Sequence, residues 1–156
     1  MSFKLKDLQD LAESKGREYY LEKGFFCLPS TILAISDAMK GVDDVNYADP
    51  TVLKATGPLR AGFGIWEAPC GVVTAGSVAI GLKFGTSDVG DKATITKAWN
   101  KSGEWLRWFK YEQHGAINCF DLKATPMDKL KCANIIGQSV RKIVEILTEG
   151  NPKVLR

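Results

Sequence analysis

The sequence has a single histidine and no strong excess of charge of either sign. Its 156 residues carry 21 basic and 18 acidic side chains, for a formal net charge of +3. A charge this small creates no field that would attract nucleic acid or an anionic membrane surface. We therefore expect no nucleic-acid partner, and we interpret Lys123, Lys129 and Lys131 as part of a solvated face.

Long apolar segments are also missing. The longest weakly polar run, residues 68–82, has 15 residues and includes Pro, Thr, Ser and three Gly. A helix that spans a bilayer needs about 20 predominantly apolar residues. Residues 1–7 lack the apolar core and small-residue cleavage site of a secretion signal. The sequence thus predicts no membrane partner and a cytoplasmic location.

Several short cofactor-binding motifs are absent. No Cys-x-x-Cys pair occurs, so zinc ribbons, thioredoxin-type dithiols and covalent c-type haem attachment have no local motif. Gly81 is followed by Leu-Lys-Phe, where a phosphate-binding loop requires Gly-Lys-Ser/Thr, and residues 62–64 lack the third glycine of a dinucleotide site. A Cys/His nucleophile pair could form only between His114 and one of the cysteines, and the sequence signals no third residue to orient it. We assign no catalytic residue.

The chain does contain four widely separated cysteines, Cys27, Cys70, Cys119 and Cys132. In a reducing compartment such thiols seldom form structural disulfides. They are therefore buried inert thiols, a metal or cluster site assembled from separate segments, or catalytic redox groups. The spacing alone does not decide among these three interpretations.

Hydrophobic periodicity predicts an all-α protein. With 45% hydrophobic residues, a chain of this length can bury one core, so we expect a single domain, residues 1–156, built as a bundle of five or six helices. No period-two strand pattern, internal repeat or low-complexity linker is evident. The expected helices cover residues 3–23, 29–39, 50–53 or beyond, 69–84, 92–111 and 126–149.

The helix expected at residues 69–84 is rich in small residues. Cys70 lies beside a proline at its expected start. Gly76 and Gly81 each cost about 1 kcal/mol relative to Ala inside a helix, so we expect close packing against a neighbouring element or a bound group. The Gly-x-Gly sequence at residues 62–64 predicts a tight loop that brings the backbone close to another segment.

Cys27 is expected just before the second helix, and Cys132 is expected within the last helix. Cys27 precedes a helix N-terminus, where the helix dipole favours a thiolate. Cys132 is expected about two turns inside a final helix that Thr125 caps and Pro126 begins. We interpret His114 as a C-terminal helix cap rather than a metal ligand.

The same periodicity separates core from surface. The final helix is expected to bury one face, comprising Leu130, Ala133, Ile136, Val140, Ile143, Val144 and Leu147. The helix at residues 92–111 is expected to carry an apolar stripe of Ile95, Trp99, Leu106 and Phe109, with Trp105 and Trp108 alongside. The paired carboxylates Asp43 and Asp44 fall in a polar turn and are interpreted as solvated.

The order of the cysteines and their local motifs resembles a known family. The segments concerned are Cys27 ahead of a helix, residues 62–64 leading to Cys70-Gly71-Val72-Val73-Thr74-Ala75-Gly76, residues 81–85, Asn118-Cys119, and Lys131-Cys132-Ala133. Over about residues 20–147 they resemble the redox-active family named for its C, GCAxxG, C, C cysteine pattern. Val72 stands where Ala is usual, and Ala75-Gly76 where the family tends to have Gly then Ala, but small residues are retained.

The resemblance implies a cofactor. A related domain in split-Soret cytochromes is associated with an iron-sulfur cluster. By analogy, a cluster, expected to be of the two-iron two-sulfur type, would have as ligands Cys27, Cys70, Cys119 and Cys132. Gly71, Thr74 and neighbouring backbone N–H groups would then tune its potential by hydrogen bonding to sulfur. The haem-binding half of those cytochromes is absent, because the chain has no Cys-x-x-Cys-His.

This interpretation describes an electron-transfer or redox-sensing module with a redox partner protein, an accessory protein rather than a stand-alone enzyme. Two alternatives stay open. In the first, Cys27 with Cys70 and Cys119 with Cys132 form thiol-disulfide pairs without metal. In the second, the cysteines hold zinc in a structural interaction module. The sequence also leaves open whether the chain forms a homo-oligomer.

Overall fold

The computed structural model describes residues 1–122 and 128–156, and in these residues helices dominate. The α-helices are α1 (Leu5–Arg17), α2 (Cys27–Met39), α3 (Pro50–Thr56), α4 (Gly71–Phe84), α5 (Lys92–Glu112) and α6 (Lys129–Leu147). Three short helical turns join them, the π-helical η1 (Glu18–Glu22), the 3₁₀ turn η2 (Gly57–Leu59) and η3 (Gly62–Trp66). The prediction of an all-α fold is confirmed.

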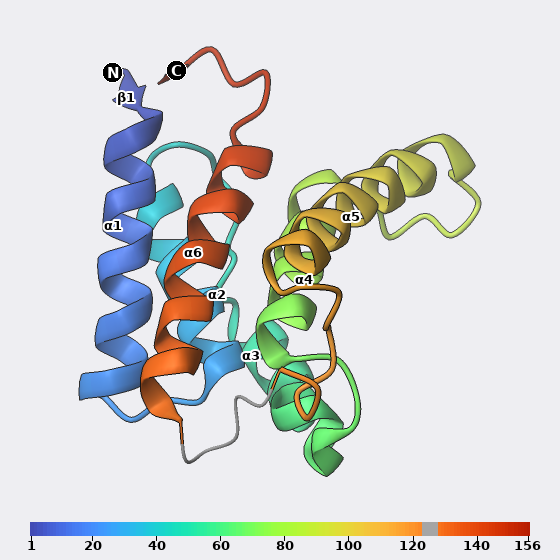
Figure 1. Ribbon diagram of the computed structural model, residues 1–156. Helices are drawn as coiled ribbons and strands as arrows, with labels where there is room; N and C mark the ends of the chain where they lie inside the picture. The colour runs from blue at the N-terminus through green and yellow to red at the C-terminus, as the bar shows by residue number, and fades with distance from the viewer. Residues whose placement is uncertain (123–127) are drawn as a thin grey trace.

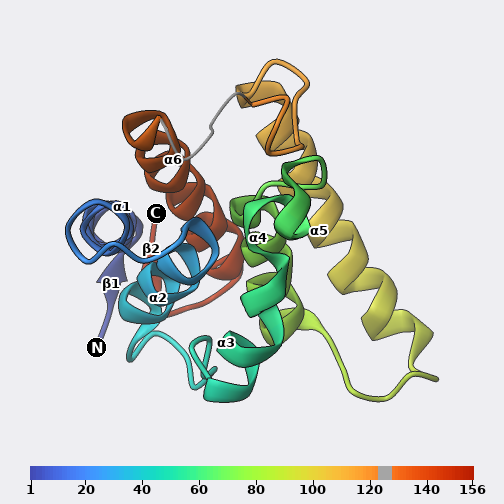
Figure 2. The same cartoon turned by 90° about the horizontal axis from the view of Figure 1, so that it is seen from below.

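The helices pack in two groups that meet at α4. On one side α1 and α6 run antiparallel and both pack against α2 (Figure 1). On the other side α5 lies along the outer side of α4 and extends beyond it (Figure 2). Helix α4 contacts α2, α5 and α6. The small residues of α4 therefore lie at the centre of the fold.

Helix α6 supplies much of the core. The predicted apolar face is fully buried at Ala133, Ile136, Val140, Ile143, Val144 and Leu147. Leu130, predicted on the same face, lies in the first turn of α6 and is 66% exposed. The predicted cap Thr125 and first residue Pro126 lie outside the described residues. Asp128 caps α6, its carboxylate accepting the Lys131 N–H at 3.0 Å.

The chain ends differ from the prediction of a helix over residues 3–23. Residues Phe3–Lys4 form β1, which pairs in parallel with β2 (Val154–Leu155). The Phe3 N–H donates to the Lys153 carbonyl at 2.7 Å. Strands of two residues are too short for a period-two pattern, which is why the sequence does not reveal them. The far end of the predicted helix is η1 rather than a continuation of α1.

The predicted stripe on α5 is confirmed at Phe109, which is fully buried, and at Leu106, which packs against the core. It is wrong at Ile95 and Trp99, which are exposed. Trp105 is also fully buried, whereas Trp99 is 73% exposed. Trp105 packs on Gly76, where an added Cβ would lie only 2.4 Å from the indole nitrogen. Its indole N–H donates to the Val73 carbonyl at 3.1 Å. The prediction of close packing is therefore confirmed at Gly76.

Gly81, the second interior glycine of α4, behaves differently. It is exposed, and a Cβ added there would meet no atom within 4 Å. The expectation of close packing at Gly81 is wrong, because the residue lies on the outer side of the last turns of α4. Gly81 nonetheless offers a matched position for testing glycines in this helix.

Asp43 is not solvated as predicted. Its side chain is 9% exposed and accepts hydrogen bonds from Lys83 at 2.8 Å and from the fully buried Tyr47 hydroxyl at 2.9 Å. The neighbouring Asp44 is exposed. Asp43 thus ties the turn after α2 to the end of α4.

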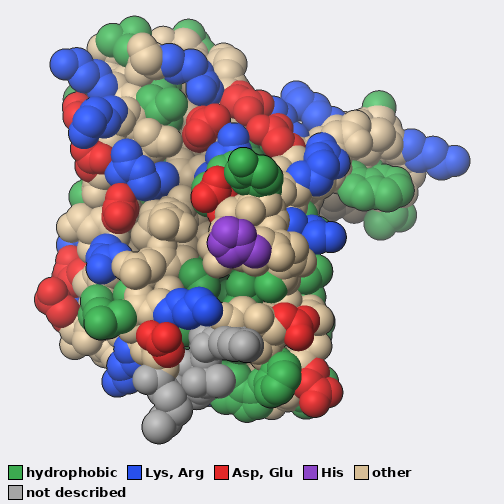
Figure 3. Space-filling model, viewed as in Figure 1, with side chains coloured by type: hydrophobic (Ala, Val, Ile, Leu, Met, Phe, Trp, Pro, Cys, Tyr) green, Lys and Arg blue, Asp and Glu red, His purple; other side chains and the backbone are tan. Residues whose placement is uncertain are grey.

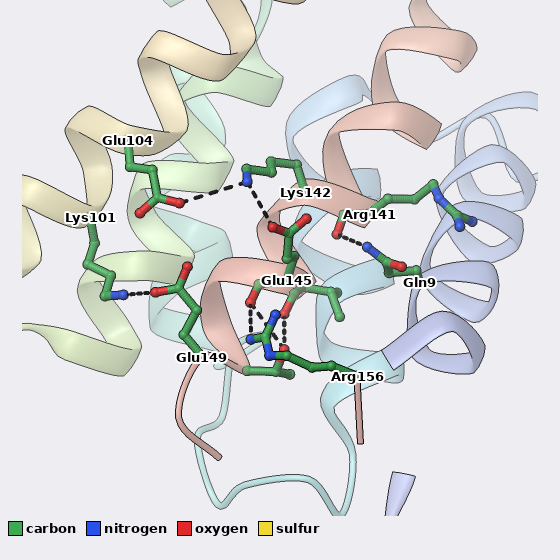
Figure 4. A network of polar contacts seen from close by, with 10 residues as sticks. Gln9, Lys101, Glu104, Arg141, Lys142, Glu145, Glu149 and Arg156 are labelled. Carbon is green, nitrogen blue, oxygen red and sulfur yellow. Dashed lines mark hydrogen bonds and ion pairs between the residues drawn. The ribbon is translucent and has the colours of Figure 1, made fainter. Parts of the chain in front are cut away.

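Ion pairs join α5 to α6 across their outer seam (Figure 4). Lys101 pairs with Glu149, and Lys142 reaches both Glu104 at 3.8 Å and Glu145 at 3.0 Å. These side chains are partly exposed, and such pairs contribute about 0–1 kcal/mol each. These ion pairs therefore add little to stability, and the buried contact of α5 is the one that Trp105 makes with Gly76 and Val73 of α4. In the described part of the chain, none of the helices combines the length and apolar character needed to cross a bilayer.

Candidate functional site

All four cysteines line one cavity of about 230 Å³. They come from the start of α2, the start of α4, the segment between α5 and α6, and the first turn of α6. Aromatic and aliphatic side chains form most of the remaining wall, including Tyr20, Phe25, Phe26, Trp66, Val72 and Ile135. The fold therefore brings together the four cysteines that the sequence keeps far apart.

Two of the cysteines sit at adjoining helix N-termini. Cys27 is the first residue of α2, which begins two residues before the predicted Pro29, and Cys70 is the N-cap residue of α4. The two helix starts approach so closely that a Cβ on Gly71 would lie 2.7 Å from the Cys27 sulfur and 3.2 Å from Leu28 Cβ. Gly71 thus makes room for the Cys27 thiol.

Backbone pairing places Cys119 beside Cys70. The segment before α4 runs antiparallel to residues 117–120. The Cys70 N–H donates to the Ile117 carbonyl at 2.8 Å, and the Cys119 N–H donates to the Ala68 carbonyl at 3.0 Å. Each cysteine is therefore held by the strand-like segment that carries the other, although 48 residues separate them.

The predicted tight loop before α4 is confirmed. A Cβ on Gly62 would lie 2.7 Å from the Ala68 carbonyl oxygen and 3.1 Å from Cys119 Cβ. Positive φ angles also occur at the non-glycine residues Ala61 (53°), Phe63 (57°) and Trp66 (65°). A left-handed conformation costs a non-glycine residue about 1–2 kcal/mol. Ala61 and Trp66 both line the cavity, so this strained backbone forms part of its wall.

Cys132 enters the cavity from α6. Because α6 begins at Lys129, Cys132 lies in its first turn rather than two turns inside, and its N–H donates to the Asp128 carbonyl at 3.2 Å. Tyr20, which η1 supplies, lines the same cavity, and its hydroxyl lowers the pKa of the Cys132 thiol. Tyr20 could not be predicted as a cavity residue, because nothing in the local pattern distinguishes it from the adjacent Tyr19.

Burial controls the electrostatics of the cysteines. Loss of solvation raises the pKa of all four thiols above the ordinary value, and the nearby Cys27 raises the pKa of Cys70 further. The Ala61 backbone lowers the pKa of Cys27 and so opposes the effect of burial. The Tyr20 hydroxyl likewise lowers the pKa of Cys132. The thiols are therefore neutral at pH 7, and a metal that binds them must displace their protons.

Two other predicted residues lie away from the cavity. His114 is exposed, with φ of 54°, directly after the last turn of α5, and it lines a separate polar cleft with Lys131 and Asn134. Its backbone ends the helix, as predicted, and its ring is not among the cavity side chains. Thr74 donates its N–H to the Cys70 carbonyl at 3.2 Å and does not line the cavity.

A protein-family profile described as "Putative redox-active protein (C_GCAxxG_C_C)" matches residues 25–146. The chain belongs to this family. The match confirms the resemblance drawn from the cysteine motifs, and all four cysteines fall inside it. Tyr20 falls outside it. Neither the curated proteins nor the solved structures include one that matches the chain.

The C_GCAxxG_C_C cysteines suit a group bound by thiolates. All four are free of disulfides. Within residues 1–122 and 128–156, no three His, Cys, Asp or Glu side chains lie close enough together to bind one metal ion. The four sulfurs are therefore spread around the cavity wall. A water molecule occupies about 30 Å³, and the cavity is several times larger. A bound group would therefore require the cysteine side chains to turn toward the cavity centre.

Proposed function

We propose that the protein is a redox module in which Cys27, Cys70, Cys119 and Cys132 hold an iron-sulfur cluster of the two-iron two-sulfur type. The observation that carries this proposal is the presence of four thiols from four segments on the wall of one cavity. Four cysteine thiolates are the ligand set of such clusters. The role proposed for the module is electron transfer or redox sensing.

The chain's own residues suit that role. The cluster would supply one-electron chemistry when bound. The N-termini of α2 and α4 place positive dipole ends at Cys27 and Cys70, which stabilises negative charge on their sulfurs. Lys129 adds a positive charge at the cavity wall. Val72 and Ile135 add apolar wall beside the sulfurs, and an apolar surrounding strengthens these electrostatic interactions.

The rim of the cavity supports the proposal of a redox partner protein. Phe25, Phe26 and Trp66 line the cavity and yet are 42%, 53% and 40% exposed. Hydrophobic side chains also gather on the lower part of the face in Figure 3, below the single histidine. Aromatic residues are enriched at the centres of protein interfaces, and contact at this rim would bring a partner's redox group close to the cysteines.

Anaerobic purification followed by visible absorption spectroscopy tests the proposal. We expect an absorption band from the unmutated chain that is lost in Cys70→Ser, since Cys70 is buried at the centre of the site. Ser77→Ala is the matched control in α4, because the Ser77 hydroxyl bonds to Ser102 at 2.8 Å and does not line the cavity. A colourless unmutated chain without iron would overturn the proposal.

A thiol-disulfide function is the second candidate, favoured by the close approach of Cys27 to the start of α4. In this case Cys27 and Cys70 would lose two protons and two electrons to a disulfide-containing partner and form an S–S bond. Mild oxidation of the metal-free protein would then lower the mass by two hydrogens per pair. A colourless protein with stoichiometric zinc and no response to oxidants would instead support a structural zinc site.

A further inference from the structure

A second hollow lies beside the cysteine cavity. Its volume is about 350 Å³, and its wall is formed by the segment before α2, the first turns of α2, α3 and residues 57–60. It shares Gly24, Phe25 and Phe26 with the cysteine cavity, so these residues form a common wall. None of the four cysteines lines it. We call this hollow the α2–α3 groove.

The wall of the α2–α3 groove is apolar and firmly supported. Leu28 is fully buried in an apolar cluster with Ile32 and Ala75, and Leu53 packs against the same cluster. Leu33 lines the groove further along α2 and is partly exposed. Because the floor of the groove belongs to the packed core, its shape does not depend on an occupant. Its leucines offer apolar surface to a hydrocarbon group.

Arg60 supplies the only charge on this wall among the described residues. Its guanidinium lies over the Phe26 ring, with Cζ 3.7 Å from the ring centroid, a cation–π contact that holds the side chain beside the groove. Within residues 1–122 and 128–156, Arg60 forms no ion pair with a carboxylate. A guanidinium presents a planar fork of N–H groups that matches a carboxylate. The groove therefore combines an apolar wall with one cation that lacks a counter-ion in this part of the chain.

The size of the α2–α3 groove favours a small molecule over a partner protein. Small-ligand pockets have volumes of about 300–1,000 Å³ and mostly apolar walls, with a few polar groups that orient the ligand. The groove, at about 350 Å³ with Arg60 on its wall, fits this description. A protein interface instead involves about 20–30 residues on each side, whereas nine described residues line the groove.

We propose that the α2–α3 groove binds a small apolar carboxylic acid, with its carboxylate on Arg60 and its hydrocarbon chain on Leu33 and Leu53. This proposal goes beyond the redox function, because it involves none of the four cysteines and needs no cluster. The bound acid would cover Phe25 and Phe26, which are 42% and 53% exposed and also line the cysteine cavity. An occupant of the groove thus lies against the rim at which we propose a redox partner protein.

Binding of octanoate to the metal-free full chain tests the proposal, with octanol as the uncharged analogue of the same length. Isothermal titration calorimetry gives the affinities, and methyl NMR shows whether the Leu33 and Leu53 signals shift. We expect octanoate to saturate one site below about 1 mM, the weakest affinity expected for a ligand of this size, and to bind more tightly than octanol. Arg60→Gln should weaken octanoate binding about tenfold and leave octanol binding unchanged.

Two further variants separate the charge from the apolar wall. Lys54→Gln is the matched control, because Lys54 is an exposed cation on α3 that does not line the groove; it should leave both affinities at the wild-type value. Leu33 lines the groove but lies outside both core clusters. Leu33→Gln should therefore weaken octanoate and octanol binding alike while the protein stays folded.

Four results would overturn the proposal. The first is no saturation by octanoate at about 1 mM, and the second is equal affinity for octanoate and octanol or an equal loss of octanoate binding in Lys54→Gln and Arg60→Gln. The third is octanoate binding without shifts of the Leu33 and Leu53 methyl signals, which would place the acid elsewhere. The fourth is a capped Leu-Leu-Phe-Glu peptide that binds more tightly than octanoate, which would assign the groove to a protein segment. Each is measured without iron, so each leaves the proposed redox function standing.

Discussion

Replacement of Gly71 by alanine should disturb the cysteine site far more than it disturbs the fold. The added Cβ would lie 2.7 Å from the Cys27 sulfur, which would have to withdraw by about 0.7 Å to reach the 3.4 Å at which ordinary contact begins. Leu28 blocks part of the space, because its Cβ would lie at 3.2 Å. Overpacking of this kind costs about 1–3 kcal/mol, and the better helix propensity of alanine offsets about 1 kcal/mol of it.

We therefore expect Gly71→Ala to lower the free energy of unfolding of the metal-free protein by about 1 kcal/mol. Mutation of a residue that supports a metal ligand typically lowers metal affinity about 10–100-fold. The iron content of Gly71→Ala after purification should therefore fall steeply. Urea unfolding and iron analysis measure the two effects. The control is Gly81→Ala, where the new Cβ meets nothing within 4 Å and should stabilise α4 by about 1 kcal/mol without loss of iron. Wild-type iron content in Gly71→Ala would refute the reasoning.

Three further predictions concern the fold. Trp105→Phe should lower the free energy of unfolding by about 1–3 kcal/mol, because it leaves a gap beside Gly76 and removes the bond to the Val73 carbonyl; a change below about 0.5 kcal/mol in urea unfolding would contradict the packing described. Asp43→Ala should lower the free energy of unfolding by about 2–3 kcal/mol, because it leaves the buried Tyr47 hydroxyl unpaired. Its control is Asp44→Ala at an exposed position, which should change the free energy of unfolding by less than about 0.5 kcal/mol. The hydrogen bond to Asp37 and burial raise the pKa of Tyr19 from 10.0 to about 12. Its contribution to stability is therefore complete below pH 10 and lost as the pH rises through 12, and Tyr19→Phe should reduce the fall in stability over that interval.

The helices could be predicted from the sequence because their cause is local. Apolar residues at steps of three and four identify the buried face of α6, and proline marks the starts of α3 and α4. The length of the buried stripe on α5 could not be predicted, because the contact forms where Gly76 on another helix admits Trp105, and Trp99 is left exposed. Local pattern alone does not report which aromatic residue a distant glycine will accept.

In the candidate site, too, the features with a local cause could be predicted and those that depend on distant segments could not. The positions of Cys27 and Cys70 near helix starts follow from the neighbouring prolines. The meeting of Cys70 with Cys119 depends instead on backbone pairing between segments 48 residues apart, and the resemblance to the family rather than any spacing pointed to it. Tyr20 depends on a π-helical turn that has no sequence signal of its own. The burial of Asp43 could not be predicted, because its partners, Lys83 and Tyr47, become its neighbours only in the folded chain.

Chemical analysis of iron and acid-labile sulfide in the unmutated protein, purified anaerobically, tests the central claim most directly. The account predicts two iron atoms and two sulfides per chain, both lost together when Cys27, Cys70, Cys119 or Cys132 is changed to serine. A protein that contains neither iron nor sulfide after anaerobic purification, while its four thiols remain intact, would contradict the claim that this cavity holds a cluster.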